Sequence, residues 1–387
     1  MHILLIPSTY PTEENPVRGI FYRDQAVALA RAGHRVGVLA LARIASVSVL
    51  RKFLRHPVIR TYFDISDDNG AITYQITSWN LISTPTLYAK KLSKIVLSGY
   101  NDYVKNYGAP DVIHSHNSLY GGYAGAKLKE STGLPLVLTE HSSNFITRQF
   151  LPNTEYPADI AIQAADVRLA VSSALARNLQ SRNPKKPFSV LGNIVDTVFF
   201  MLPDQQPEPS PFVFCAVCSL VPTKALDIML HAFAKAFVSK NVILRIAGDG
   251  RQKQMLKELA HNLGVDTQVE FLGQLSRYGV RELLYSSHAI VSSSRVETFG
   301  VNLIEALACG KPVVATRCGG PEDFVNERNG LLATVNDVTE LANVMRQMVD
   351  TWHGYDPVLI RKECVDRFSE PVIVAKLETV YQGLINK

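Results

Sequence analysis

The sequence predicts an α/β protein with two doubly wound domains, each built on a parallel sheet. Short apolar runs, typical of buried strands, alternate with helical stretches along the whole 387-residue chain. That length is too great for one ordinary core, and residues 202–211 hold four prolines, which interrupt helices and central strands. We therefore expect an N-terminal domain over 1–200, a proline-rich linker over 201–211 and a C-terminal domain over 212–369.

The first domain should contain seven strands separated by helices. We expect the strands near 2–6, 35–41, 71–76, 110–115, 135–139, 166–171 and 187–191, and the helices near 20–32, 86–106, 121–130, 157–164 and 172–181. Two doubly wound domains in one chain imply a cleft, because ligands of such folds bind outside the carboxyl ends of the strands.

The second domain should repeat this plan. We expect strands near 212–218, 241–247, 268–272, 288–292 and 312–316, and helices near 225–238, 251–263, 277–286, 300–309, 338–350 and 357–368. A final helix over 370–387 is too short to form a domain, and we expect it to pack back across the interface.

Composition indicates a globular protein. Apolar residues make up 47% of the chain and charged residues 19%, and no apolar run approaches the roughly 20 residues that span a bilayer. The first apolar run lacks the layout of a signal peptide, so we expect a cytoplasmic protein. Cys215 and Cys218 form a C-x-x-C within a strand-like run, where they would point to opposite faces, and this argues against a redox or zinc site.

A basic segment lies in the first domain. No acidic residue occurs between Asp24 and Asp64, and residues 43–60 combine arginines and a lysine with apolar side chains. Such a segment can lie on an anionic membrane surface, or it can be a solvated loop that packs its apolar members inward.

The densest functional signal runs from Ser292 to Pro321. A strand ends at about Ser292, a loop carries Glu297, and a helix runs from near Gly300 to Gly310. The free amides at the start of that helix form an anion site. Glu297 precedes this site and Glu305 lies eight residues later, a layout that matches a nucleotide-sugar, because carboxylates accept from pairs of hydroxyls.

An ordered set of motifs resembles a known family. The E-x7-E stretch ETFGVNLIEALACGKPVVAT is followed by GGPEDFV and NGLL, and SLVPTKALD opens the second domain. The first domain carries Gly19-Ile20-Phe21 ahead of a helix, then DVIHSH and LPLVLTEH, and GNIVD precedes the linker. Together these motifs are similar to the family 4 retaining glycosyltransferases, which have the GT-B fold, and the resemblance covers nearly the whole chain.

The resemblance implies a donor site in the second domain. Glu297 would contact the hydroxyls of the donor sugar, and Glu305 would hold the ribose hydroxyls. The backbone around Phe299, Gly300 and Val301 would bind phosphate and sugar. The reaction would need no metal and no cofactor besides the nucleotide-sugar.

The remaining implied contacts come from both domains. Lys224 would pair with the diphosphate, Gly19 would let the first-domain loop approach donor and acceptor, and His141 would touch the transferred sugar. His116 is the second choice for that contact. His114 and His116 share a face of one strand, but no third metal ligand is apparent.

This chain departs from the family pattern beside Lys224. Many members have Gly-Arg where it has Cys218-Ser219, and Gly where it has Ala225. The missing arginine would have been a second cation on the diphosphate, and Ser219 can supply only one neutral hydrogen bond. Arg295 and Arg251 are candidates to replace that charge.

The resemblance leaves the substrates open. UDP- and GDP-linked hexoses both fit as donors, and a glycan or lipid-linked acceptor would place the reaction in polysaccharide or lipopolysaccharide biosynthesis. The other functions that we consider are a non-catalytic GT-B protein that binds sugar nucleotide or glycan, a nucleotide-sugar epimerase and a phosphorylase.

Overall fold

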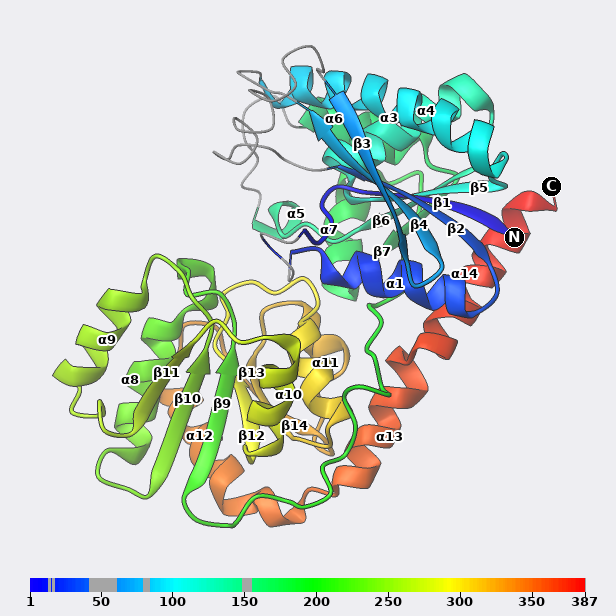
Figure 1. The fold of residues 1–387 in the computed structure, drawn as a ribbon. Coiled ribbons are helices and arrows are strands. Elements are labelled where there is room, and N and C mark those ends of the chain that lie inside the picture. The colour runs from blue at the N-terminus through cyan, green and yellow to red at the C-terminus, as the bar shows by residue number, and fades with distance from the viewer. Residues whose placement is uncertain (13–14, 16–17, 42–60, 79–83, 148–154, 387) are drawn as a thin grey trace. The chain divides into compact units, whose positions relative to one another are not determined.

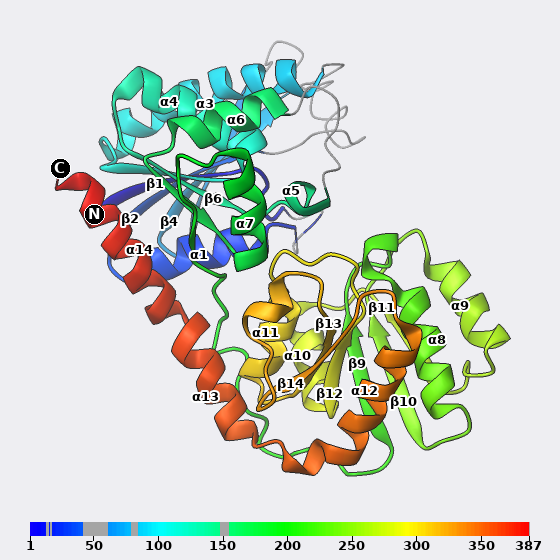
Figure 2. The ribbon, with the colours of Figure 1, turned by 180° about the vertical axis from the view of Figure 1, so that it is seen from behind.

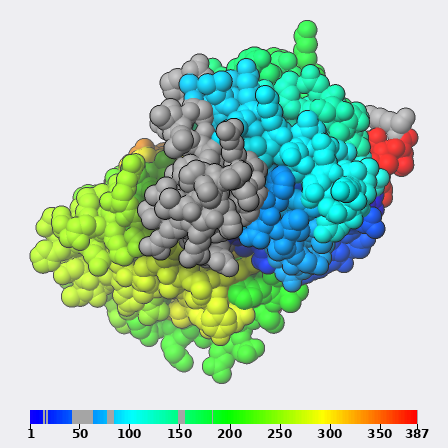
Figure 3. All heavy atoms as spheres, turned by 45° about the horizontal axis from the view of Figure 1, so that its top comes forward, coloured from blue at the N-terminus to red at the C-terminus, as the bar shows by residue number. Residues whose placement is uncertain are grey.

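A computed structural model describes residues 1–386 except 13–14, 16–17, 42–60, 79–83 and 148–154 (coloured in Figures 1 and 3). The chain forms two compact units. The first unit contains Met1–Val171, Leu175–Ile194 and Glu370–Lys387, and the second contains Ser172–Ala174 and Val195–Ser369. The division thus falls at Ile194/Val195, so the proline-rich stretch belongs to the second unit.

The first unit is built on an eight-stranded sheet in the order β3-β4-β2-β1-β5-β6-β7-β8. Its strands are β1 His2–Pro7, β2 Arg35–Leu41, β3 Thr61–Asp68, β4 Ala71–Ser78, β5 Val112–His116, β6 Leu136–Glu140, β7 Val167–Ala170 and β8 Ser189–Val190. All neighbouring strands run parallel except β3, which pairs antiparallel with β4 at the edge. Strand β3 was not predicted from the sequence.

Helices cover both faces of this sheet, as a doubly wound fold requires. In Figures 1 and 2, α3, α4 and α6 lie over one face, and α1 and α14 lie over the other. The helices of the first unit are α1 Ile20–Arg31, α3 Pro85–Tyr107, α4 Tyr123–Thr132, α5 Asn144–Thr147, α6 Glu155–Ala164, α7 Ser173–Arg182, α14 Glu370–Ile385 and the π-helical turn η1 Asn117–Gly122.

The second unit has a six-stranded parallel sheet in the order β11-β10-β9-β12-β13-β14. Its strands are β9 Phe212–Val217, β10 Val242–Ala247, β11 Val269–Gly273, β12 Ala289–Ser292, β13 Val313–Thr316 and β14 Gly330–Ala333. Strand β14, at the edge, is the one that the sequence analysis did not predict here.

The helices of the second unit again form two layers. Figure 1 shows α8, α9 and α12 on one side of the sheet and α10, α11 and α13 on the other. They span α8 Leu226–Phe237, α9 Lys253–Asn262, α10 Arg277–Tyr285, α11 Val301–Ala308, α12 Val338–Thr351 and α13 Pro357–Phe368, with short 3-10 turns η2 Pro222–Lys224, η3 Gly320–Asp323 and η4 Trp352–Gly354.

The last helix, α14, is part of the core of the first unit. Ile373, Leu377 and Tyr381 are buried there with residues of β1 and α1. Two polar contacts add to this packing: His34 Nε2 lies 2.8 Å from Glu378 Oε1, and Arg31 forms an ion pair with Glu370 at 3.1 Å. The chain therefore returns to the first unit after completing the second.

None of the helices in the described ranges is both long and apolar enough to cross a bilayer. The basic segment 43–60, for which we predicted a membrane contact, lies outside the described residues.

Candidate active site

Each sheet has one point where the strand order reverses, and the predicted site residues follow the strands at those points. In the second unit the reversal lies between β9 and β12, and Lys224 and Glu297 come in the loops that follow these two strands. In the first unit it lies between β1 and β5, and His116 is the last residue of β5. Such reversals open a crevice at the carboxyl ends of the strands, where ligands bind.

The loop between β12 and α11 is held by backbone contacts on both sides of Glu297. The N–H of Glu297 donates to Cys318 O at 3.1 Å, and its carbonyl accepts from Gly320 N at 2.7 Å. A side chain at Gly320 would prevent this approach, because an added Cβ would lie 2.4 Å from Phe299 Cα. The absence of a side chain at Gly320, in the Gly319-Gly320 pair, therefore allows the loop that carries Glu297 to approach this closely.

Helix α11 begins at Gly300, whose φ of 101° favours glycine. In the described part of the chain no side chain caps this helix, and the N–H groups of Val301 and Asn302 have no acceptor. These amides and the positive end of the helix form an anion-binding position. The side chain of Asn302 donates to Val217 O at 3.0 Å and so ties the helix start to the end of β9.

The ring of Phe299 does not line this position. It is buried, and its centroid lies 5.5 Å from that of Phe324 and 5.4 Å from that of Phe368. Only the backbone of Phe299 is thus left to contact a ligand at this position.

Lys224 and Glu297 form an ion pair inside the second unit. Their side chains are 25% and 16% exposed, so the pair is partly shielded from water but reachable. Burial by itself would lower the pKa of Lys224, but the charge of Glu297 and its hydrogen bond outweigh burial and raise that pKa. Lys224 is therefore a cation at neutral pH, as a partner for a diphosphate must be.

The turn that presents Lys224 is fixed by several contacts. Ser293 Oγ donates to the carbonyls of Lys224 and Ala225, in each case at 2.9 Å. Ala225 has a φ of 49°, the left-handed region, where many family members have glycine. The left-handed backbone at Ala225 therefore carries some conformational cost.

Arg295 takes part in the same turn. Its guanidinium lies 3.1 Å from Asp227 Oδ2 and also donates to Pro222 O, and its backbone N–H donates to Thr223 O at 2.8 Å. These contacts hold the guanidinium on the η2–α8 turn. Ser219, where the family often has arginine, is exposed.

Glu305 lies in the middle of α11 and is half-buried. Its neighbours Ile304 and Ala306 are fully buried, so the helix turns its apolar side to the core and leaves Glu305 at the edge of that side. Its carboxylate follows the anion-binding amides along one helix, as predicted.

In the first unit, Gly19 precedes α1 in the left-handed conformation, with a φ of 75°. An added Cβ would lie 2.9 Å from both Thr9 O and Thr9 Oγ1. Both the backbone angle and the space therefore require glycine here.

His141 and His116 lie in contact at the carboxyl ends of β5 and β6. His116 Nδ1 is 3.1 Å from His141 Nε2. His116 is fully buried and lies behind His141, which is half-buried. The other ring nitrogen of His141, Nδ1, is buried and, among the described residues, has no hydrogen-bond partner.

Burial keeps both rings neutral, since it lowers the pKa of His116 to about 3. Burial and then the nearby His116 lower the pKa of His141 well below its ordinary value.

Two further residues of this region were not predicted. The carboxylate of Glu140 is fully buried and accepts from Ser118 N and Oγ at 2.8 and 2.6 Å, and from the backbone N–H groups of His141 and Ser142 at 3.0 and 2.8 Å. Gln25 on α1 is buried and faces the histidines. The acidic residue that ends an apolar strand was a usable signal for Glu140, whereas nothing in the sequence distinguishes Gln25.

Within the described ranges, no group of three or more His, Cys, Asp or Glu side chains is arranged to hold a metal ion. The described cysteines are all free, and burial raises the pKa of Cys218 and Cys318 to about 11. Metal independence stays a prediction.

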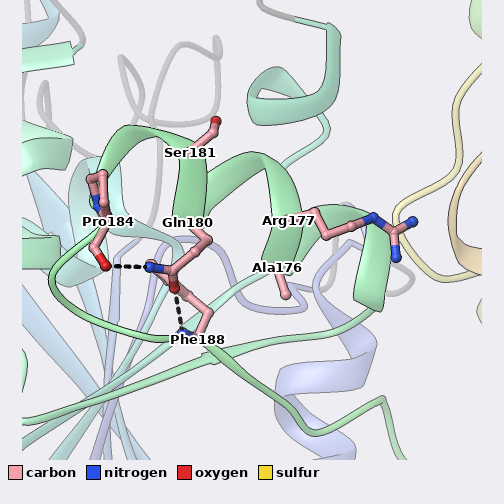
Figure 4. A pocket seen from close by; sticks show the side chains of 6 residues that line it. All are labelled: Ala176, Arg177, Gln180, Ser181, Pro184 and Phe188. Atoms are coloured by element: carbon pink, nitrogen blue, oxygen red, sulfur yellow. Dashed lines mark hydrogen bonds between the residues drawn. The ribbon is translucent and has the colours of Figure 1, made fainter.

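A separate surface groove lies along α7 and the loop after it (Figure 4). Gln180 turns back toward the loop, donating to Pro184 O at 2.9 Å and accepting from Phe188 N at 3.2 Å. The groove contains none of the predicted site residues. Its lining consists of Ala176, Arg177, Gln180, Ser181, Pro184 and Phe188.

Two family models match the sequence. The model described as Glycosyltransferase Family 4 matches residues 19–199, and the one described as Glycosyl transferases group 1 matches residues 201–356. The chain belongs to the family 4 glycosyltransferases. The two matched ranges correspond to the two units of this glycosyltransferase.

Characterised and uncharacterised relatives agree with this membership. The glycosyltransferase is 26% identical over 288 residues to the N-acetyl-alpha-D-glucosaminyl L-malate synthase of Bacillus anthracis, covering 71% of this chain and 75% of that one. It is 23% identical to an uncharacterized glycosyltransferase of Methanocaldococcus jannaschii over 99% of this chain and 98% of the other.

Solved structures share the fold along the whole chain. HepE from Anabaena, in complex with UDP and glucose, superposes with a TM-score of 0.75 at 20% identity, covering 99% of this chain and 100% of that one. Sucrose-phosphate synthase from Thermosynechococcus elongatus superposes with a TM-score of 0.77 at 18% identity, with full coverage of both chains. The fold is therefore GT-B, as predicted.

Proposed function

We propose that this glycosyltransferase moves a hexose from a UDP- or GDP-linked donor to a glycan or lipid-linked acceptor, with retention of configuration. One observation carries the donor assignment. After the strands where its sheet order reverses, the second unit has a charged lysine and one carboxylate in loops, then an uncapped helix start and a second carboxylate within that helix. The complex of the similar protein HepE with UDP-glucose supports a nucleotide-sugar donor here.

Each residue then has one role in the reaction. Glu305 holds the ribose hydroxyls, Glu297 and His141 contact the sugar, and Gly19 lets the first-unit loop approach the donor and acceptor. Lys224 and the amides at the start of α11 bind the diphosphate. Because negative charge builds on the diphosphate as it leaves, donors already fixed in place stabilise the transition state more than the ground state.

The bond changes balance without a metal or a cofactor. The anomeric carbon–oxygen bond breaks, and its electron pair departs with the diphosphate. The acceptor oxygen bonds to the anomeric carbon on the same face, and its proton passes to a diphosphate oxygen. This order is proposed from the family resemblance, and Lys224 supplies the cation that the leaving group needs.

Release of nucleoside diphosphate tests the proposed function. Purified protein is incubated with UDP- and GDP-hexoses, with and without a mixed glycan and lipid-linked acceptor fraction. We expect release that depends on the acceptor, together with a glycosylated product. Conversion of the donor sugar to an isomer without acceptor would identify an epimerase, and donor binding without any turnover would identify a non-catalytic binding protein.

We further propose that residues 43–60 bring the enzyme to the cytoplasmic face of a membrane, where a lipid-linked acceptor of polysaccharide or lipopolysaccharide assembly would be presented. The support is the charge pattern of the sequence. In flotation with vesicles containing anionic lipid, the wild type should float, and replacing Arg51, Lys52 and Arg55 by Ser should abolish flotation. A wild type that stays in the soluble fraction would contradict this proposal.

A further inference from the structure

A buried group of polar side chains connects α14 to His141 inside the first unit. His114 and His116 are two residues apart on β5, and the register pairs His116 with Thr139 on β6, so all three point to one face of the sheet. That face is covered by α1 and α14, which contribute Gln25 and Tyr381. Every one of these side chains is buried.

The contacts run through this group without a gap. Tyr381 OH lies 2.6 Å from His114 Nδ1, and Thr139 Oγ1 lies 2.8 Å from His114 Nε2. The amide nitrogen of Gln25 lies 3.3 Å from His114 Nδ1 and 3.5 Å from His116 Nε2. His116 Nδ1 then reaches His141 Nε2 at 3.1 Å.

With the amide nitrogen of Gln25 oriented toward both rings, the count of donors indicates which nitrogen of each ring carries its proton. A neutral imidazole has one N–H and one lone pair, whereas the amide nitrogen of glutamine has two N–H groups and accepts nothing. The two ring nitrogens that face Gln25 are therefore acceptors. His116 must then carry its proton on Nδ1 and donate to His141 Nε2, which leaves the proton of His141 on Nδ1.

The two hydroxyl contacts of His114 are compatible with the same assignment. Burial raises the pKa of Tyr381, so its hydroxyl is protonated and can donate to a lone pair on His114 Nδ1. His114 Nε2 then carries the proton and donates to Thr139. With the opposite tautomer, the N–H of His114 would face the amide N–H of Gln25, and two buried donors would oppose one another.

We propose that Gln25 is a positioning residue that, acting through His116, holds His141 in the Nδ1–H tautomer. This inference rests on the proposed function, in which His141 contacts the transferred sugar. The nitrogen without a protein partner is Nδ1, so the tautomer decides what His141 offers the sugar. This nitrogen is buried in the structure, and a sugar oxygen that reached it would meet an N–H donor instead of a lone pair.

The backbone of His141 is held separately from its ring. Its N–H donates to Asn117 Oδ1 at 3.1 Å and to Glu140 Oε1 at 3.0 Å. The rings of Phe21 and Tyr22 lie 5.1 and 5.0 Å from the imidazole, centroid to centroid. A change at Gln25 should therefore alter the protonation pattern and leave the position of the ring in place.

Nitrogen-15 NMR of histidine-labelled protein reads the tautomer directly, because a protonated ring nitrogen and a lone-pair nitrogen resonate far apart. The His141 signals are assigned by their loss in His141→Gln. We expect the wild type to show His141 protonated on Nδ1, and Gln25→Met, which keeps the size but has no donor, to show a mixture of tautomers. Gln25→Leu serves if the methionine variant does not fold.

Thr139→Val is the matched control. It also removes one buried hydrogen bond of the same group, but that bond reaches only His114. The control should keep the His141 tautomer and the rate of sugar transfer, whereas Gln25→Met should lower kcat about tenfold with little change in KM for the donor.

A wild type with His141 protonated on Nε2, or an unchanged His141 spectrum in the donorless variant, would overturn the inference. The spectra need no substrate. A wild type that shows the Nδ1–H tautomer but transfers no sugar would therefore count against the proposed function alone.

Discussion

Two neighbouring residues keep the side chain of Lys224 protonated and hold its turn in place. Glu297 raises its pKa against the effect of burial, and Ser293 holds the carbonyl of the turn that presents it. The sequence predicted Lys224 from its motif. It could not predict that Arg295, the candidate second cation, pairs with Asp227 and Pro222, because only the folded turn shows these contacts.

Lys224→Ala should lower the rate of nucleoside diphosphate release by more than tenfold, since one charge-assisted contact contributes about 1.4 kcal/mol or more to the transition state. Steady-state kinetics with saturating donor measure this effect. Lys127→Ala is the control, because it removes an exposed ion pair with Glu130 on α4 and should leave the rate unchanged. Wild-type turnover in Lys224→Ala would remove this lysine from the mechanism.

The buried polar residues that contact the histidines were the hardest to predict from the sequence. Glu140 and Gln25 belong to no spacing pattern, and their functions depend on which strands and helices become neighbours in space. His116 and His141 were singled out by motif. Their order, with His116 behind His141, required the structure.

At the scale of elements, apolar periodicity predicted the interior of both sheets. The predicted strand 35–41 matches β2 at both ends, and the predicted helix 357–368 matches α13. The unpredicted strands β3 and β14 are both at sheet edges. Strand β3 carries three aspartates and pairs antiparallel, so it lacks the apolar run of a central strand. Strand β14 is apolar but has only four residues and begins with a glycine.

The loop that carries Glu297 depends on a close backbone approach at Gly320. Gly320→Ala places a Cβ 2.4 Å from Phe299 Cα and O, so it should destabilise the second unit by about 1–3 kcal/mol and weaken donor binding. Thermal unfolding with and without donor nucleotide measures both effects. Gly354→Ala, where nothing lies within 4 Å of an added Cβ, should stay within about 0.5 kcal/mol of wild type. Equal stability of the two variants would be inconsistent with this packing.

At the scale of the whole molecule, the sequence predicted two α/β domains and a final helix that packs back across the interface, but it placed the boundary at the proline-rich stretch. The second unit continues from Val195, and helix α14 begins 175 residues later in the sequence. Even so, Tyr381 of α14 is buried in the core of the first unit. An amphipathic terminal helix does not reveal which sheet it covers. The contact of Tyr381 with His114 makes the end of the chain part of the histidine group.

The buried histidines should make the first unit sensitive to acid. Burial lowers the pKa values of His114 and His141 well below 6.5 and that of His116 to about 3, so the unfolded chain binds more protons below pH 6.5. The free energy of unfolding should then fall as pH drops from about 6.5 toward 3, by up to about 1.4 kcal/mol per pH unit for each histidine. Burial raises the pKa of Glu140 above its ordinary value of 4.5. Above pH 4.5 this carboxyl therefore acts in the opposite direction, increasing the free energy of unfolding as pH drops.

Hydrogen exchange of the β5 and β6 amides, corrected for the intrinsic pH dependence of exchange, measures this effect. His114→Gln should reduce the dependence of the free energy of unfolding on pH by the equivalent of about one proton. His261→Gln, which changes an exposed ring, should not reduce it. Protection that stays constant between pH 7.5 and pH 5 would contradict neutral buried histidines.

The central claim is that the second unit binds a nucleotide-sugar through Lys224, Glu297, Glu305 and the start of α11. Isothermal titration calorimetry with UDP and GDP tests it most directly. The account predicts saturable binding of one nucleotide, weakened about tenfold or more in Glu305→Ala, where the ribose loses its carboxylate, and unchanged in Glu258→Ala, an exposed acid on α9. Wild-type affinity in Glu305→Ala, or no binding of either nucleotide to the wild type, would contradict it.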